Sequence, residues 1–195
     1  MKKLFLVVFS LTLIINSFPA FESTYKPLES EKVLFINGNI LDGEGNEFLN
    51  TDLFINDGKI VAIGQGISVD DEDVKIINAK NKWITPGIID IHSHMGVYPA
   101  PSVRTSSDGN EATSPVTAEV WAEHSMWVQD PQYSLALKGG VTTSHVLPGS
   151  ANLIGGRGVT VKNLQRNTIQ SMKYPNAKHS LKMACGENPK RVYGK

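Results

Sequence analysis

Short runs of alternating apolar and polar residues fill the chain between residues 31 and 84. The segments "VLFINGNIL", "DLFIN" and "KIVAIG" alternate as strands do when one face is buried. Asp57-Gly58 separates the last two, and this dipeptide is a strong signal for a hairpin turn. Turn signals recur about every ten residues, a spacing typical of sandwiches. The pattern therefore predicts a small antiparallel β-sandwich segment over residues 31–84.

The apolar pattern changes after Pro86. "GIIDIHSH" is a run dominated by isoleucine, as expected of a strand covered on both faces in a parallel sheet. Residues 116–140 have helical propensity, with an interruption at Asp130-Pro131 and an end at Gly139-Gly140. Further strands are expected at 141–149 and 180–184, and residues 152–163 are expected to form a glycine-rich turn and a short strand. This alternation of strands and helices predicts an α/β domain over residues 85–195.

The first residues form a separate segment. Lys2 and Lys3 precede a run of twelve residues, 4–15, in which Ser10 and Thr12 are weakly polar and the rest apolar. A membrane-spanning helix needs roughly twenty residues, so no stable membrane span is expected. The length and the basic start are typical of a secretory signal peptide, here placed at residues 1–22. Export to the periplasm or the extracellular space is predicted, and a buried core helix is the alternative.

Composition narrows the function classes. Lys plus Arg and Asp plus Glu each number 19, so the net charge is zero, and no basic cluster with interleaved aromatic residues is present. No nucleic-acid partner is therefore expected. The single cysteine, Cys185, excludes an internal disulfide framework and any metal site made of several cysteines from this chain.

The end of the strand "GIIDIHSH" carries the most informative side chains. Residues two apart in a strand point to one face, so Asp90, His92 and His94 are expected to lie together. Two imidazoles side by side can bind a divalent ion, most readily zinc. Asp90 is placed to orient a ligand ring from behind it. The histidine pair alone gives weak support for a metal site. Its position after an apolar strand that begins at Pro86-Gly87 strengthens this support.

Three motifs in order connect the sequence with a known family. "TPGIIDIHSH" resembles the first barrel strand of the amidohydrolase superfamily, which comprises metal-dependent hydrolases built on a (β/α)8 (TIM) barrel. The segment "LFINGNILDGEG…DLFINDGKIVAIG" is similar to the β segment that precedes the barrel in many members. "KGGVTTSHVLPGSANLIGGRGV" is similar to the imidazolonepropionase-related branch. The resemblance implies that residues 85–195 are the first strands and helices of such a barrel, preceded by the β-sandwich segment.

The resemblance also implies a metal site. His92 and His94 take the place of the first-strand ligands of one or two divalent ions, most readily zinc. A further family ligand is a carboxylated lysine or a glutamate at the end of a later strand. Two residues compete for that place, Glu187 just beyond the last predicted strand and Lys182 within it. Glu187 lies where ligands of barrel enzymes project, and the resemblance favours it because a few related branches use a glutamate after such a strand. An acid at the start of a helix near Pro189 is the alternative reading of Glu187.

Two further residues are weaker candidates for substrate contacts. His145 lies in the second predicted parallel strand and could line the pocket or be a hydrogen-bonded core residue. Arg157, in a glycine-rich loop without the ending of a phosphate-binding motif, could pair with a substrate carboxylate.

A complete barrel takes about 250 residues, and only about 110 follow the β segment. The chain is therefore expected to be the N-terminal portion of a longer enzyme, with the general acid and base aspartate beyond Lys195. The implied activity is hydrolysis of a C–N bond in an amide, cyclic amide or dipeptide by a metal-activated water. The isolated chain is expected to be inactive. Related enzymes often form oligomers, so a homo-oligomer is a further expectation. The rival hypothesis is an exported, non-catalytic scaffold that keeps the barrel.

Overall fold

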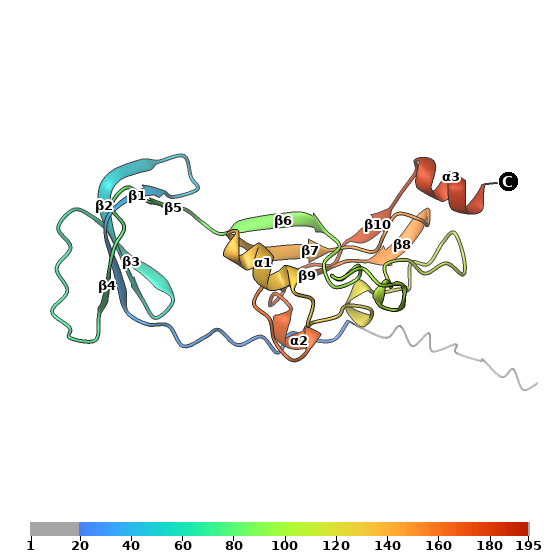
Figure 1. Cartoon of the computed structure of the whole chain (residues 1–195), viewed down its shortest axis with the longest axis horizontal. Helices are drawn as coiled ribbons and strands as arrows, with labels where there is room; N and C mark the ends of the chain where they lie inside the picture. Colours follow the sequence, from blue (N-terminus) through green and yellow to red (C-terminus); the bar gives the residue numbers. More distant parts are fainter. Residues whose placement is uncertain (1–19, 195) are drawn as a thin grey trace, which may run out of the picture.

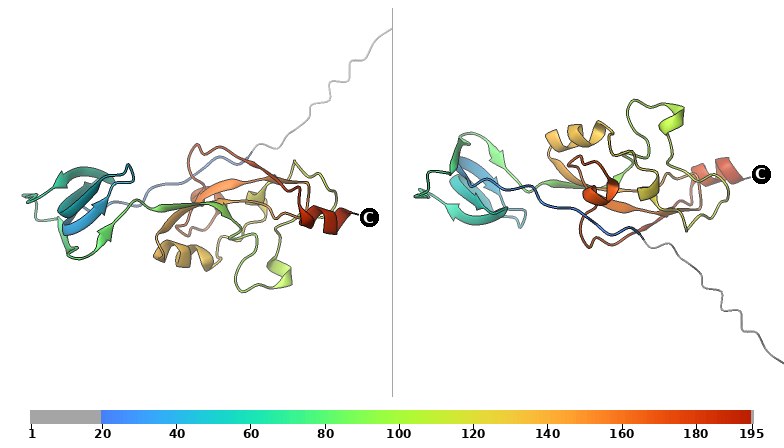
Figure 2. Two further views of the ribbon diagram at one scale, coloured as in Figure 1. Left: turned by 90° about the horizontal axis from the view of Figure 1, so that it is seen from above. Right: turned by 90° about the horizontal axis from the view of Figure 1, so that it is seen from below.

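A computed structural model describes residues 20–194, and the molecule is elongated (Figure 1). A β unit lies at one end and an α/β unit at the other. Two segments join them: the connection from β5 (Trp83–Ile84) to β6 (Ile88–Ser93), and residues 20–32, which run along the α/β unit. Both views in Figure 2 show the two units side by side along the long axis. Among the described residues, no helix is long and apolar enough to cross a membrane. Residues 1–19 of the predicted signal peptide lie outside the described residues.

The β unit is one five-stranded sheet. Its strands are β1 (Val33–Leu41), β2 (Glu47–Asn56), β3 (Lys59–Gly64), β4 (Lys75–Asn78) and β5 (Trp83–Ile84). The order is β3-β2-β1-β4, with β5 also pairing with β1. The hairpin between β2 and β3 turns at Asp57-Gly58, where both residues have positive φ, as this turn type requires.

Two features of the β unit differ from the sequence-based prediction. The expectation of a wholly antiparallel unit was wrong, because β4 and β5 pair with β1 in parallel. The connection 65–74 is long enough for the chain to return to the same end of the sheet before β4 begins. In addition, the described residues form one sheet here and not two facing sheets.

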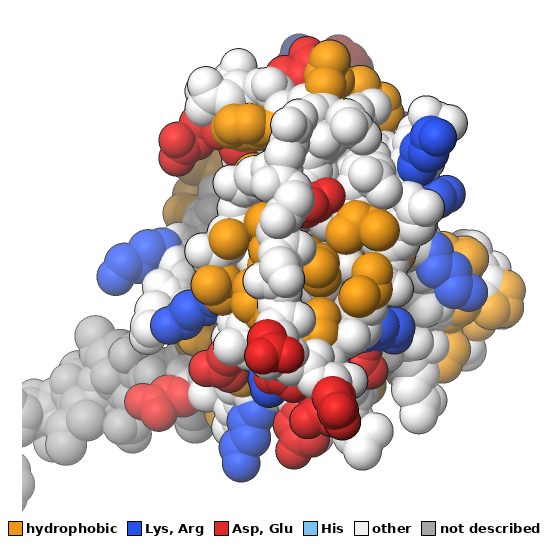
Figure 3. All heavy atoms as spheres, turned by 90° about the vertical axis from the view of Figure 1, so that its left-hand side faces the viewer, with side chains coloured by type: hydrophobic (Ala, Val, Ile, Leu, Met, Phe, Trp, Pro, Cys, Tyr) orange, Lys and Arg blue, Asp and Glu red, His pale blue; other side chains and the backbone are white. Residues whose placement is uncertain are grey.

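The β unit has a small core and apolar side chains on its surface. Leu34, Ile40, Leu53 and Ala79 are buried. Large apolar side chains remain exposed on the strands and their ends, namely Leu41, Leu49, Ile60, Val61, Ile63, Ile76 and Trp83. Figure 3 faces this end of the molecule and shows apolar side chains gathered in its middle, with carboxylates along its lower rim. The single sheet therefore does not bury all the apolar surface that its sequence pattern supplies.

The α/β unit contains two small sheets. Strands β6 (Ile88–Ser93), β7 (Val141–Val146) and β9 (Val159–Lys162) form one sheet in that order. Strands β8 (Ile154–Arg157) and β10 (Leu181–Met183) form the other. β6 pairs with β7 in parallel, whereas β9 returns antiparallel to β7. The mixed α/β class predicted for residues 85–195 is confirmed.

Three short helices and two 3-10 turns accompany these strands. The helices are α1 (Gln132–Lys138), α2 (Ile169–Met172) and α3 (Glu187–Tyr193), and the turns are η1 (Arg104–Ser106) and η2 (Ala122–His124). Helix α1 ends before Gly139-Gly140 as predicted, and Gly140 has a positive φ. A buried cluster connects the strands with the helices, and its members are Val97, Ala122, Tyr133, Val146, Val159, Val161 and Met172.

The helix predicted over residues 116–140 is largely absent, and only α1 forms. Val116 and Trp121 instead form parallel bridges to Ile154 and Arg157 at the two ends of β8. These bridges satisfy backbone groups that a helix would have used internally, so tertiary context overrides local propensity.

Strand β6 is not covered on both faces in the described chain. Ile88, Ile89 and Ile91 are more than half exposed, although their residue types predict burial.

Candidate metal centre

His92 and His94 lie together at the carboxyl end of β6. Their ring centroids are 5.2 Å apart and the rings meet edge to face. His92 belongs to the strand, and His94 is the first residue after it. The end of the strand therefore carries one imidazole, and the start of the following loop carries the other. The predicted pair of neighbouring imidazoles is present in the structure.

Lys182 joins this pair from a distant part of the chain. Its Nζ lies 3.2 Å from Nε2 of His92, across 90 positions of sequence. Pairing of β10 with β8 places Lys182 opposite Gly156. The close ammonium group is the main cause that lowers the pKa of His92, and burial lowers the pKa of Lys182. Both groups are thereby biased toward their neutral forms, which have free electron pairs.

The His94 ring is fixed by a backbone group. Its Nδ1 donates to the carbonyl oxygen of Leu147, at 2.9 Å. Leu147 follows strand β7, and its own N–H donates to Ser93, so the two neighbouring strands hold each other in this region. A hydrogen bond from Nδ1 leaves Nε2 of His94 as the electron-pair donor. This tautomer is the one suited to binding a metal through Nε2.

Asp90 has a different partner from the one that the sequence suggested. Its Oδ1 accepts a hydrogen bond from the backbone N–H of His92, at 3.0 Å. It therefore fixes the main chain of the first histidine, and a contact with an imidazole N–H is not formed in this structure. Its negative charge opposes the lowering of the His92 pKa.

An open pocket of about 440 Å³ lies beside these groups. It is lined by Ile91, His92, His145, Leu147, Ser180, Leu181, Lys182 and Met183. His145 has hydrogen-bond partners at both ring nitrogens, Thr160 Oγ1 at 2.9 Å and Ser180 Oγ at 2.6 Å. Gly158 leaves the space for this arrangement, because a Cβ there would lie 2.9 Å from Nε2 of His145. His145 thus lines the pocket and is hydrogen-bonded at the same time.

Glu187 and Arg157 lie apart from the histidine pair. Glu187 is in the first turn of α3 with its side chain 92% exposed, and it pairs with Lys190 at 3.8 Å. The Arg157 guanidinium lies over the Trp121 ring at 4.6 Å and donates to Ala118. Arg157 is adjacent to Gly156, the partner of Lys182, so alternation along β8 directs its side chain to the opposite face. Of the two competitors for the further ligand position, the structure brings Lys182 to the histidines.

The described part of the chain has no group of three or more His, Cys, Asp or Glu side chains placed to hold a metal ion. The candidate centre contains two imidazoles and one lysine, and lysine is not one of these four residue types. An imidazole and a lysine with lowered pKa values, His92 and Lys182, beside a second imidazole fit a divalent ion, because nitrogen ligands must give up their protons to bind it. The sequence did not predict the contact of the Leu147 carbonyl with His94, because a main-chain acceptor has no residue-type signal. It also did not predict the contact of the Ser180 hydroxyl with His145, because the two residues are 35 positions apart.

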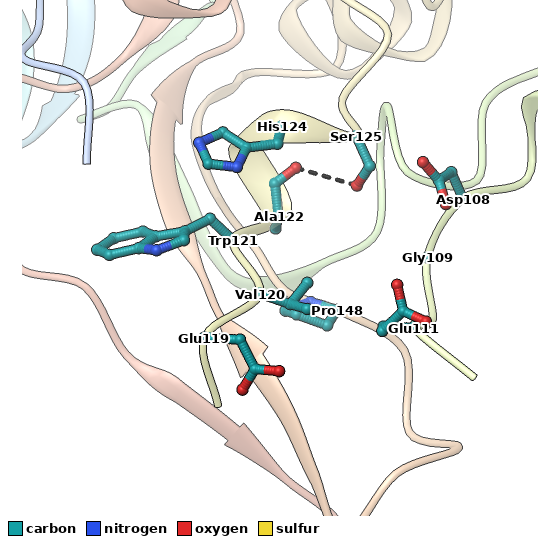
Figure 4. Close-up of a pocket in the computed structure, with 10 residues that line it drawn as sticks. All are labelled: Asp108, Gly109, Glu111, Glu119, Val120, Trp121, Ala122, His124, Ser125 and Pro148. Atoms are coloured by element: carbon teal, nitrogen blue, oxygen red, sulfur yellow. Dashed lines mark hydrogen bonds between the residues drawn. The ribbon is translucent and has the colours of Figure 1, made fainter. Parts of the chain in front are cut away.

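A second pocket, of about 340 Å³, is separate from this centre (Figure 4). Asp108, Glu111 and Glu119 bring three carboxylates to it, and Trp121 and His124 also line it. Asp108 and Glu119 are exposed and Glu111 is half-buried, so water solvates these charges. Because surface acids are ordinarily solvated, this pocket has no group with altered chemistry comparable to Lys182.

Comparison with known proteins finds amidohydrolases that this chain resembles. The chain is 39% identical to a crystal structure of an amidohydrolase from Thermotoga maritima MSB8, with a TM-score of 0.73, over 84% of this chain and 41% of that one. It is also 38% identical to the amidohydrolase tasK of Hapsidospora irregularis over 132 residues, which are 63% of this chain and 14% of tasK. The chain belongs to the amidohydrolase superfamily. Comparison with protein-family models gives no match.

A further relative matches a shorter part of the chain. A dihydroorotase of Bacillus cytotoxicus is 42% identical over 62 residues, which are 32% of this chain and 14% of that protein. The chain thus spans 14% of the length of these curated relatives and 41% of the Thermotoga structure. The predicted membership of the superfamily is confirmed, while the narrower imidazolonepropionase-related branch stays a prediction.

Proposed function

We propose that this chain supplies the first strands and the first metal ligands of a metal-dependent amidohydrolase that cleaves C–N bonds. The observation that supports the proposal most strongly is the approach of Lys182 to His92, beside His94. Two imidazoles and a lysine from separate strands meet at the carboxyl end of β6, where barrel enzymes carry their sites. Relatives named amidohydrolase and dihydroorotase support the same reaction class.

The exposed face of β6 supports a barrel that continues beyond the described strands. Ile88, Ile89 and Ile91 are apolar but mostly exposed, and the chain spans 41% of the Thermotoga structure. Covering these side chains with further strands and helices would bury the apolar surface that drives folding. In this proposal β6 and β7 are the first two parallel strands of a (β/α)8 barrel, and the activity belongs to the completed barrel.

His92 and His94 would hold the ion, and Lys182 would provide the third ligand. When bound, a divalent ion such as zinc lowers the pKa of a water molecule toward neutrality and polarises the scissile carbonyl. The Leu147 carbonyl keeps His94 in the tautomer that presents Nε2. Asp90 holds the His92 backbone in place. His145, with both nitrogens engaged, forms a polar wall of the pocket.

Lys182 can become an oxygen ligand by a simple step. A neutral lysine amine attacks carbon dioxide, an N–C bond forms, and one proton is released to leave a carbamate. The lowered pKa of Lys182 raises the population of the neutral amine that this step needs. The carbamate would then present oxygens toward His92, in place of a repelling ammonium group. We therefore place Lys182, before Glu187, in the ligand position.

The substrate class proposed is an amide, a cyclic amide or a dipeptide, taken up as a small molecule in the pocket beside Lys182. Export is proposed from the basic and apolar start of the chain. A homo-oligomer is proposed as well, and the exposed apolar side chains of the β unit are where subunits could meet. The rival is a non-catalytic scaffold, but such a protein has no need for two imidazoles beside a lysine.

Equilibrium dialysis with zinc in bicarbonate buffer tests this proposal. The wild-type chain should bind at least one zinc ion, and the variant with both His92→Ala and His94→Ala should bind none. His124→Gln is the matched control, because its side chain is 45% exposed and lies outside the centre. Undiminished zinc binding by the double variant would contradict the proposal. The 195-residue chain alone should hydrolyse amides no faster than its His92→Ala variant, since a faster rate would show that the rest of the barrel is unnecessary.

A further inference from the structure

Asp130 is a buried acid close to the loop that follows His94. It precedes helix α1, and it is fully buried with 0% of its surface exposed. The salt bridges found among residues 20–194 do not include it. A buried carboxylate without a cation is costly unless several donors satisfy it. The reason for keeping one at this position must lie in the groups that it binds.

The Asp130 carboxylate accepts four hydrogen bonds. Oδ2 accepts from the backbone N–H of Gly96 at 2.8 Å and from Gln132 Nε2 at 2.9 Å. Oδ1 accepts from the backbone N–H of Ala100 at 3.2 Å and from that of Gln132 at 3.0 Å. A carboxylate can accept at both of its oxygens, whereas an amide has one acceptor oxygen. An asparagine at this position would direct its NH₂ group at one pair of these donors.

These bonds link the start of α1 to residues 95–100, the loop after His94. Two of the four donors belong to this loop, and Gln132 adds a third connection by donating to the carbonyl of Tyr98 at 3.0 Å. The Tyr133 hydroxyl donates to the carbonyl of Met95 at 3.1 Å. Gly96 has a φ of +81°, and a side chain there would overlap the Tyr133 hydroxyl. The loop is therefore held in one conformation by three polar side chains at the start of α1, those of Asp130, Gln132 and Tyr133.

The loop in turn holds His94. The backbone N–H groups of Val97 and Tyr98 both donate to the carbonyl oxygen of His94, at 3.2 and 3.0 Å. The Tyr98 ring also meets the His94 ring edge to face, with centroids 5.6 Å apart. Asp130 thus acts on His94 through the backbone at Gly96 and Ala100, and through Gln132 and Tyr98.

We propose that Asp130 is a positioning residue of the metal centre, which fixes the 95–100 loop and thereby the direction of His94. The inference rests on the proposed function, because it assumes that His94 binds an ion. It explains why a buried carboxylate without a cation is kept: the donors it must satisfy converge on the residues that follow a metal ligand. Loss of an outer partner of a metal ligand typically weakens metal binding by about 10–100-fold.

The test compares Asp130→Asn with wild type in zinc affinity, measured by competition with a chromophoric chelator, and in hydrogen exchange of the backbone. Asp130→Asn should bind zinc at least about tenfold more weakly. Exchange should rise at Gly96 and Ala100 while the β strands stay protected. Asp108→Asn is the control, because this carboxylate is exposed and should leave the affinity unchanged. If Asp130→Asn fails to fold, Gln132→Met removes the connection to Tyr98 and should weaken zinc binding several-fold.

The outcomes separate the two proposals. Equal zinc affinities of the wild type, Asp130→Asn and Gln132→Met would overturn the positioning role and leave the metal centre standing. A wild-type chain that binds no zinc at all would overturn the metal centre, and the positioning role with it. A tenfold loss in Asp130→Asn with faster exchange in every strand would also count against positioning, because the whole fold would then have loosened.

Discussion

Lys182 Nζ lies 3.2 Å from Nε2 of His92, although 90 positions separate the two residues in sequence. A positively charged Lys182 amine and a positively charged His92 imidazole would repel each other at this distance. This repulsion is the main reason that the pKa of His92 is lowered. The contact depends on β10 pairing with β8 and on β6 lying beside them. It brings Lys182, and not the exposed Glu187, to the histidine pair.

Lys182→Met and Glu187→Gln should therefore differ in metal binding. Lys182→Met removes the third ligand and should reduce zinc affinity at least about tenfold, whereas Glu187→Gln should leave it unchanged because Glu187 is exposed and remote. Isothermal titration calorimetry of both variants in bicarbonate buffer measures this. A loss confined to Glu187→Gln would return the ligand position to that glutamate.

His145 predicts a dependence of stability on pH. Burial is the main cause that lowers its pKa, so the folded chain binds the proton less readily than the unfolded chain. Its contribution to stability is therefore complete above the ordinary histidine pKa of about 6.5 and is lost as the pH falls below that value, through the lowered folded pKa. Urea unfolding between pH 8 and 5 should show the loss.

The matched variant for this effect is His145→Gln, which can still hydrogen-bond but does not titrate in this range. Its stability should fall less between pH 8 and 5 than that of the wild type. His92 also has a lowered pKa, so it contributes to the loss of wild-type stability at low pH. The variant His92→Gln measures this second contribution. Equal slopes in the wild type and both variants would refute the assignment.

Two methionines provide a matched pair for the core. Met172 is fully buried in the cluster with Val161, whereas Met183 is 56% exposed at the end of β10. Met172→Ala should lower the free energy of unfolding by about 2–5 kcal/mol. Met183→Ala should change it by less than about 0.5 kcal/mol. Chemical denaturation of the two variants checks the difference, and similar losses would mean that the buried cluster is misplaced.

The buried ion pair of Glu123 and Lys173 should control the docking of the N-terminal segment. Both side chains are at least 93% buried, and together they bind the backbone of Phe21: its N–H donates to Glu123 Oε1 at 3.1 Å, and Lys173 donates to its carbonyl. Lys173→Met leaves the Glu123 charge unpaired and should cost about 3–5 kcal/mol of stability. Proteolysis near Phe21 should become faster in the same variant.

A double variant separates charge from packing at this pair. Glu123→Leu combined with Lys173→Met removes both charges and should be closer to the wild type in thermal unfolding than Lys173→Met alone. A double variant at least as unstable as the single one would show that the unpaired charge is not the cause.

The sequence predicted the local parts of this structure better than the distant ones. The hairpin at Asp57-Gly58, strand β6 and the stop of α1 before Gly139 all follow from residue types within a few positions. The helix expected before Asp130 failed, because Val116 and Trp121 pair with β8. A bridge of that kind depends on a partner more than thirty residues away, which a local pattern does not contain.

In the candidate centre, too, local features could be predicted from the sequence and contacts between distant residues could not. The pair His92 and His94 could be predicted because both histidines belong to one short segment. The structure brings Lys182 to the histidines because β10 pairs with β8, whereas the family resemblance had favoured Glu187. Asp130 had no sequence signal beyond an acid before a proline, since its role comes from four donors gathered by the fold.

X-ray absorption at the zinc edge tests the central claim most directly, because it identifies the atoms bound to the ion. The zinc-loaded chain in bicarbonate should show scattering from two imidazoles together with an oxygen donor, and His92→Ala should lose one imidazole. Sulfur bound to zinc would point instead to Cys185, the exposed free thiol. That result, or a spectrum without imidazole, would contradict a metal centre made by His92, His94 and Lys182.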